Sequence, residues 1–107
     1  MGPVLGFSKN DVNVWLGIPY AQPPVNDLRW RAPREPVGWS EPKNATQFGE
    51  ACPQGALGLS GSEDCLFLNI WSSQSEGSSK PVMFFIHGGG NVIGSADQGG
   101  LYDGQRF

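Results

Sequence analysis

The stretch Pro81-Val-Met-Phe-Phe-Ile-His-Gly-Gly-Gly90 decides the fold class of this chain. Its first half is a continuous apolar run, which is typical of a strand buried on both faces of a parallel sheet. Parallel neighbours are joined by crossovers of a dozen or more residues, and the rest of the sequence has no helical pattern that could supply them. We therefore predict a strand at residues 82–86, within an α/β domain whose sheet is incomplete in this chain.

Two further segments are strand candidates. Residues 65–71 are apolar at nearly every position and rich in β formers. Residues 12–16 alternate weakly and run into a segment with prolines at positions 19, 23 and 24. Proline excludes helix there, so this path is predicted to be extended.

The remaining segments predict irregular structure. Residues 28–42 interleave tryptophan and proline, which indicates a segment held against the body of the protein by Trp30 and Trp39. Residues 72–80 are polar and residues 91–107 are rich in glycine, so both are expected to form turns and loops.

Composition excludes several classes of protein. The 107 residues include 16 glycines and 9 prolines, which implies many turns and little continuous helix. A net charge of -3 leaves no basic footprint for nucleic acid, and no apolar run is long enough for a membrane span. The N-terminus shows no signal peptide, but a trimmed mature chain would look the same, so the compartment stays open.

The three glycines after the apolar run admit three interpretations. In a phosphate loop of the pattern G-x-x-x-x-G-K, a lysine should follow Gly94, but Ser95 stands there. In an oxyanion hole, backbone N–H groups stabilise the negative oxygen of an acyl-transfer intermediate, and His-Gly-Gly-Gly after a central strand is typical of that arrangement. A plain glycine-rich turn remains the third possibility.

Cys52 and Cys65 enclose twelve residues. Their spacing alone is compatible with a disulfide or with two reduced thiols. A metal site is disfavoured because two sulfurs and one distant histidine do not complete a tetrahedral set.

Taken together, the segments resemble the type-B carboxylesterase and cholinesterase family. The resemblance rests on collinear motifs that cover almost the whole chain: Gly17-Ile-Pro-Tyr-Ala21, Leu28-Arg-Trp30, Cys52-Pro-Gln54, Ser62-Glu-Asp-Cys-Leu-Phe-Leu-Asn-Ile-Trp71 and the His87–Gly90 element. It implies an α/β-hydrolase fold, of which residues 1–107 are expected to be the mostly β N-terminal part of a single domain.

The resemblance also implies roles for individual residues. Gly89 and Gly90 match the glycines whose N–H groups help to form the oxyanion hole, and Gly88 shapes the turn. Cys52 and Cys65 match a pair that commonly forms a disulfide. A secreted location is favoured if this pair is oxidised, and a cytoplasmic one is possible otherwise.

Three more positions take their roles from the same resemblance. Arg29 and Glu63 match a structural ion pair, although two solvated charges would contribute little. His87 matches a structural position that orients the loop rather than a catalytic base. Asn91 stands where the family commonly has an aromatic or small residue, which leaves substrate preference open.

The implied reaction is hydrolysis of a small, uncharged carboxylic ester through a serine acyl-enzyme, with no metal or organic cofactor. The chain has no G-x-S-x-G motif, so the serine, acid and histidine of the triad are expected beyond residue 107. The isolated residues 1–107 are therefore expected to be inactive. The competing hypothesis is a non-catalytic adhesion or interaction protein of the same fold.

Overall fold

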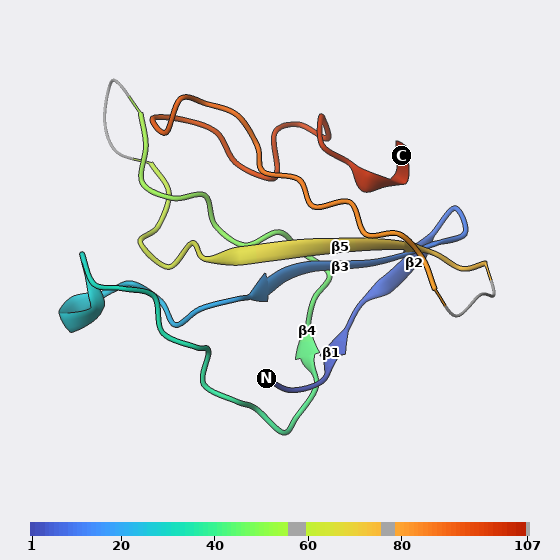
Figure 1. Cartoon of the computed structure of the whole chain (residues 1–107), viewed down its shortest axis with the longest axis horizontal. Coiled ribbons are helices and arrows are strands. Elements are labelled where there is room, and N and C mark those ends of the chain that lie inside the picture. The colour runs from blue at the N-terminus through green and yellow to red at the C-terminus, as the bar shows by residue number, and fades with distance from the viewer. Residues whose placement is uncertain (56–59, 76–78, 107) are drawn as a thin grey trace.

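A computed structural model describes residues 1–55, 60–75 and 79–106 of the chain (Figure 1). Its elements are two short strands, β1 (Val4–Leu5) and β2 (Phe7–Lys9), a long strand β3 (Val12–Pro19), the 3-10 turn η1 (Asn26–Leu28), β4 (Lys43–Asn44), β5 (Phe67–Ser73) and the 3-10 turn η2 (Gly104–Arg106). Among the described residues, no helix is long and apolar enough to cross a membrane.

The main sheet has three antiparallel strands in the order β2-β3-β5. Strands β2 and β3 form a hairpin through a two-residue loop, Asn10 and Asp11, whose φ angles are 50° and 60°. Positive φ at both positions matches the right-handed twist of the strands, and Asn and Asp tolerate it better than other non-glycine residues. A separate parallel pair, β1 and β4, lies beside this sheet (Figure 1).

The long strand β3 contains a bulge at Gly17. The pairing of β3 with β5 shifts register between Trp15 and Ile18, and Gly17 adopts a φ of 69°. The Gly17 N–H leaves the ladder and donates to Asn69 Oδ1 at 2.9 Å. A Cβ at Gly17 would lie 2.6 Å from the carbonyl oxygen of Gln47, so both the backbone angle and the space require glycine.

The core is small and centred on one face of β3. Val14, Leu16 and Ile18 alternate along the strand and are buried, together with Ala21 and Ala45. The prediction of strand at residues 12–16 is confirmed, with β3 running on to Pro19. The prediction of strand at residues 65–71 is confirmed with a shift, since β5 begins at Phe67 and ends at Ser73.

The predicted buried strand at residues 82–86 is not formed. The structure assigns no strand to this segment, and its side chains are 57% to 90% exposed. The segment is apolar in sequence, but among the described residues no strand pairs with it. Phe85 instead packs against Tyr102 of the C-terminal segment, with ring centroids 4.9 Å apart.

The tryptophan-proline segment is held by one of its two tryptophans. Trp39 donates its indole N–H to the Pro3 carbonyl oxygen at 2.7 Å, and Lys43 lies over its ring at 4.7 Å. Trp30 is 96% exposed with a φ of 59°, so the prediction that it anchors the segment is wrong. Trp30 comes two residues after the end of η1, at Leu28, and its side chain is left in solvent.

Candidate oxyanion loop

The glycine-rich loop at residues 87–94 folds back on itself. The N–H groups of Val92 and Ile93 both donate to the carbonyl oxygen of Gly89, at 3.0 and 3.1 Å. Gly89, Gly90 and Gly94 have φ angles of 134°, 62° and 115°, a region that L-residues rarely adopt. The three glycines are therefore needed for the shape of this turn.

The backbone donors of the loop remain available. Within the described part of the chain, the N–H groups of Gly88, Gly89 and Gly90 donate to no protein acceptor. All three residues are exposed, and a Cβ built on Gly88 or Gly90 would meet nothing within 4 Å. Free N–H groups without a side chain in the way can approach an anion closely.

His87 lies beside this turn and contacts its backbone. Its Nδ1 is 2.8 Å from the Gly88 carbonyl oxygen, and in the tautomer that carries its hydrogen on Nδ1 the ring donates to this carbonyl. A Cβ on Gly94 would lie 2.9 Å from the same nitrogen. The structure thus places the ring against both ends of the loop, which is compatible with the predicted orienting role.

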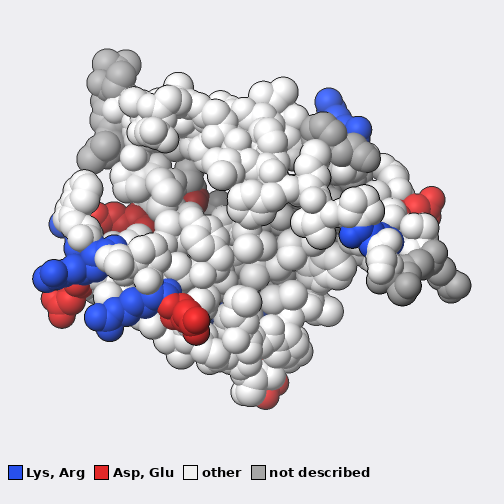
Figure 2. All heavy atoms as spheres, viewed as in Figure 1, with Lys and Arg blue, Asp and Glu red and all other residues white. Residues whose placement is uncertain are grey.

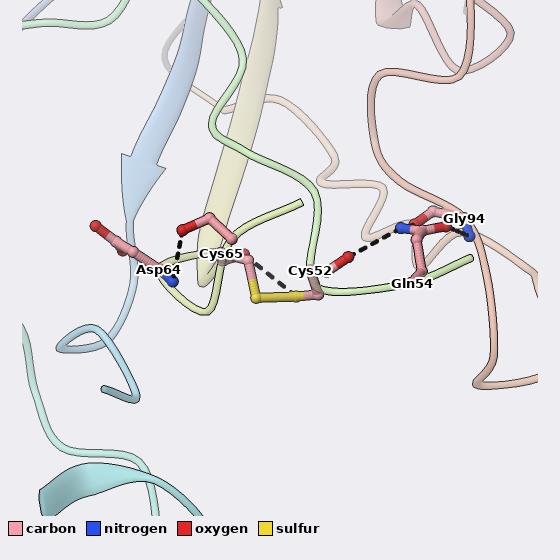
Figure 3. The surroundings of a disulfide bond; sticks show 6 residues. Cys52, Gln54, Asp64, Cys65 and Gly94 are labelled. Atoms are coloured by element: carbon pink, nitrogen blue, oxygen red, sulfur yellow. Dashed lines mark hydrogen bonds between the residues drawn. A yellow bond between two sulfur atoms is a disulfide. The ribbon is translucent and has the colours of Figure 1, made fainter. Parts of the chain in front are cut away.

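The disulfide between Cys52 and Cys65 is present, as predicted, with the two Cα atoms 5.0 Å apart. It joins the segment around Cys52 to the approach to β5 (Figure 3). The two sides are also joined by backbone hydrogen bonds, from Ser62 N–H to Ala51 O and in both directions between Gln54 and Ser60. Together these bonds brace the segment that carries Gln54.

Gln54 connects the disulfide segment to the glycine-rich loop. Its side-chain Oε1 accepts from the Gly94 N–H at 2.7 Å, and its Nε2 donates to the Gly94 carbonyl oxygen at 2.9 Å (Figure 3). This role of Gln54 was not predicted from the sequence, where Gln54 stands only as the last residue of the motif Cys52-Pro-Gln54. The only hint of such a role in the sequence is that Gln54 stands two residues after Cys52.

The predicted pair Arg29 and Glu63 lies in contact. Arg29 Nε is 2.6 Å from Glu63 Oε1, and the two side chains are 52% and 42% exposed. The pair links the residue after η1 to the stretch that leads into Cys65. Exposed pairs of this kind contribute at most about 1 kcal/mol, so its effect is on local orientation more than on stability.

Two hollows in the described part of the chain lie away from the glycines at 88–90. The larger, of about 400 Å³, lies between the end of β3 and the proline-rich segment, next to Trp39. The smaller, of about 290 Å³, is lined by residues 48–51 together with Ser95 and Asp97. The glycine-rich loop is thus presented on the surface of this chain.

Charged side chains form no field of one sign on the face seen in Figure 2. Basic and acidic atoms lie intermingled near the edges, and the middle of the face is uncharged. Nothing on this face would steer a highly charged ligand over a long distance.

The chain matches a known protein family and several of its members. The family model described as "Carboxylesterase family" matches residues 1–107. The para-nitrobenzyl esterase of Bacillus subtilis is 41% identical over 99% of this chain and 23% of its own length. Carboxylesterase 1D of Rattus norvegicus is 39% identical over 94% of this chain and 20% of its own length.

Solved structures give the same result. A structure of PNB esterase matches with a TM-score of 0.86 and 42% identity, covering 94% of this chain and 21% of that one. A crystal structure of a Geobacillus stearothermophilus carboxylesterase also matches with a TM-score of 0.86 and 42% identity, over 95% of this chain and 21% of that one.

The chain therefore spans about a fifth of the length of the relatives it matches. At this level of identity the neighbours define the fold, and the chain forms a mostly β portion of an α/β-hydrolase fold. The match of the family model over all 107 residues and the agreement of sequence and structural relatives show that the chain belongs to the carboxylesterase family.

Proposed function

We propose that the protein containing this chain hydrolyses carboxylic esters through a serine acyl-enzyme, and that this chain supplies the oxyanion loop. The observation that carries the proposal is the group of free, exposed N–H donors at Gly88–Gly90, in a turn that three positive-φ glycines shape. An acyl-transfer enzyme needs such donors at the point where negative charge develops.

In the proposed reaction, a serine hydroxyl attacks the ester carbonyl and transfers its proton to a histidine base. The carbonyl oxygen becomes negative, and the N–H groups of Gly89 and Gly90, with one from the residue after the serine, donate to it. Collapse of the intermediate expels the alcohol and leaves an acyl-serine, which water then hydrolyses. The serine, the acid and the histidine base are expected outside residues 1–107.

The proposed substrates are small, uncharged, moderately apolar esters. Relatives are named as a para-nitrobenzyl esterase, a phenmedipham hydrolase and a fumonisin B1 esterase, so related proteins carry names for quite different substrates. We propose no cofactor, because serine acyl transfer needs none.

The test is a burst experiment on the full-length protein. Mixed with p-nitrophenyl acetate, it should release about one equivalent of p-nitrophenol before steady turnover, because the acyl-enzyme accumulates. A fluorophosphonate probe should label one serine and abolish turnover. A folded protein that shows neither turnover nor labelling would refute the proposal and favour the non-catalytic alternative.

A further inference from the structure

The side-chain amide of Gln54 engages both backbone groups of Gly94. Oε1 accepts from the Gly94 N–H at 2.7 Å, and Nε2 donates to the Gly94 carbonyl oxygen at 2.9 Å and to the Cys52 carbonyl oxygen at 3.2 Å. An amide oxygen only accepts and its nitrogen only donates, so this orientation satisfies every contact and the flipped one satisfies none. The amide is held in one orientation by its surroundings.

Gly94 is the point at which the loop closes. A Cβ there would lie 2.6 Å from the Gly88 carbonyl oxygen and 2.9 Å from His87 Nδ1, so the Gly94 backbone rests directly on the start of the loop. Between these two ends, the Gly89 carbonyl oxygen accepts from Val92 and Ile93. A bond that fixes Gly94 therefore restrains the whole turn.

Gln54 can act as a support because its own segment is braced. Its backbone N–H and C=O exchange hydrogen bonds with Ser60 at 2.9 and 2.8 Å, and Cys52, two residues earlier, is bonded to Cys65. The loop residues 87–93 are all exposed, so packing contributes little to their position. Among the described residues, no other side chain from outside the loop hydrogen-bonds to it.

We infer that Gln54 is a positioning residue for the oxyanion loop: by holding Gly94 it sets where the N–H groups of Gly89 and Gly90 point. This inference rests on the proposed esterase function. Oxyanion donors act only when they are aimed at the developing charge, so a loosened loop lowers the rate of the chemical step. Substrate binding does not need that aim, so KM should change little.

The test compares full-length wild type with Gln54→Met, which keeps the length of the side chain and removes its hydrogen bonds. We expect kcat to fall about 10- to 100-fold with little change in KM, a loss below that for deleting an oxyanion donor outright. Gln47→Ala is the matched control, because Gln47 is an exposed glutamine in the same chain, and it should keep wild-type kinetics.

Gln54→Glu provides a second variant, nearly isosteric, in case Gln54→Met does not fold. An ionised carboxylate can accept from Gly94 N–H but cannot donate to the carbonyl oxygens, whereas the protonated acid can donate again. Its kcat relative to wild type, measured at each pH, should therefore rise as the pH is lowered towards the pKa of the introduced carboxyl group. A residue with only a general structural role would not produce that recovery.

Hydrogen exchange of the peptide that covers residues 88–94 tests the restraint without using activity. We expect faster deuterium uptake in Gln54→Met than in wild type and in Gln47→Ala. If wild type hydrolyses no ester, the proposed function fails, while the exchange result still decides whether Gln54 restrains the loop. Unchanged exchange, unchanged kcat in Gln54→Met, or a change confined to KM would each overturn the inference.

Discussion

Replacing Cys52 and Cys65 together by alanine should lower the free energy of unfolding of the full-length protein by about 3 kcal/mol. The two cysteines are separated by 13 positions in the sequence. In the chain-entropy account, a disulfide that closes a loop of this size stabilises the protein by about 3 kcal/mol, because it restricts the unfolded chain. The native segment keeps its backbone bonds between Gln54 and Ser60, so little native structure should be lost with the bridge.

The assay is urea unfolding followed by tryptophan fluorescence and far-ultraviolet circular dichroism. Coincident transitions are required before a free energy is extracted. Trp71 is a suitable probe, since it lies in β5 with its ring centroid 6.4 Å from that of Phe48. Titration of free thiols in denatured wild type should find neither of the two cysteines reactive before reductant is added.

Replacement of both cysteines by serine is the matched control for the entropic origin of the effect. Loop-closure entropy depends on which residues are joined and not on what replaces them, so the two double variants should lose the same free energy. Losses that differ by more than about 1 kcal/mol would mean that side-chain burial dominates. A loss below about 1 kcal/mol in both variants would refute the loop-closure argument for this bridge.

Three further predictions concern the fold. Gly17→Ala should lower the free energy of unfolding of the full-length protein, measured in urea, by at least about 2 kcal/mol, because Gly17 has a positive φ and its Cβ would overlap the Gln47 carbonyl oxygen. Gly38→Ala is the control and should be nearly neutral, since a Cβ there meets nothing within 4 Å. Equal effects of the two substitutions would contradict the bulge at Gly17. A double-mutant cycle on Arg29 and Glu63 should give a coupling of at most about 1 kcal/mol that falls at high salt, and a larger, salt-independent value would contradict a solvated pair. The isolated residues 1–107 should show no cooperative thermal melt, because few side chains are buried and residues 82–86 are exposed. They should also show no ester turnover above a heat-killed control, because they contain no G-x-S-x-G motif. A cooperative melt or measurable turnover would contradict the corresponding prediction.

Sequence reasoning found the features that depend on local pattern. The apolar, β-rich run before Trp71 and the alternation around Val14 both became strands, because hydrophobic pattern over a few residues is enough to favour a strand. The run of glycines after His87 likewise indicated a turn, and the structure forms one there. The role of Gln54 was not found, because its partner Gly94 is forty residues away and nothing in the local pattern indicates the contact.

The prediction of a strand at residues 82–86 was wrong although the local pattern is strong. Its pattern favours a strand strongly, but a strand exists only where neighbours accept and donate its hydrogen bonds. The prediction that Trp30 anchors its segment was wrong for a similar reason. An apolar side chain near a proline-rich turn is buried only if the turn faces the body of the protein, and Trp30 is exposed. In both cases the side chains are apolar, as the sequence shows, but no part of the described chain buries them.

The contrast between residues 82–86 and the loop that follows them indicates what determines the shape of the candidate site. The run before His87 is exposed and unpaired, yet the loop from His87 to Gly94 has a defined turn. Its conformation therefore does not depend on pairing of the preceding strand. It depends on glycine backbone angles, on the bonds to the Gly89 carbonyl oxygen and on the amide of Gln54, which is braced by the disulfide. The N–H groups that we propose as oxyanion donors are set by local backbone chemistry and by one contact distant in the sequence. Substitutions at Gln54 or Gly94 should therefore disturb them more than substitutions in the apolar run.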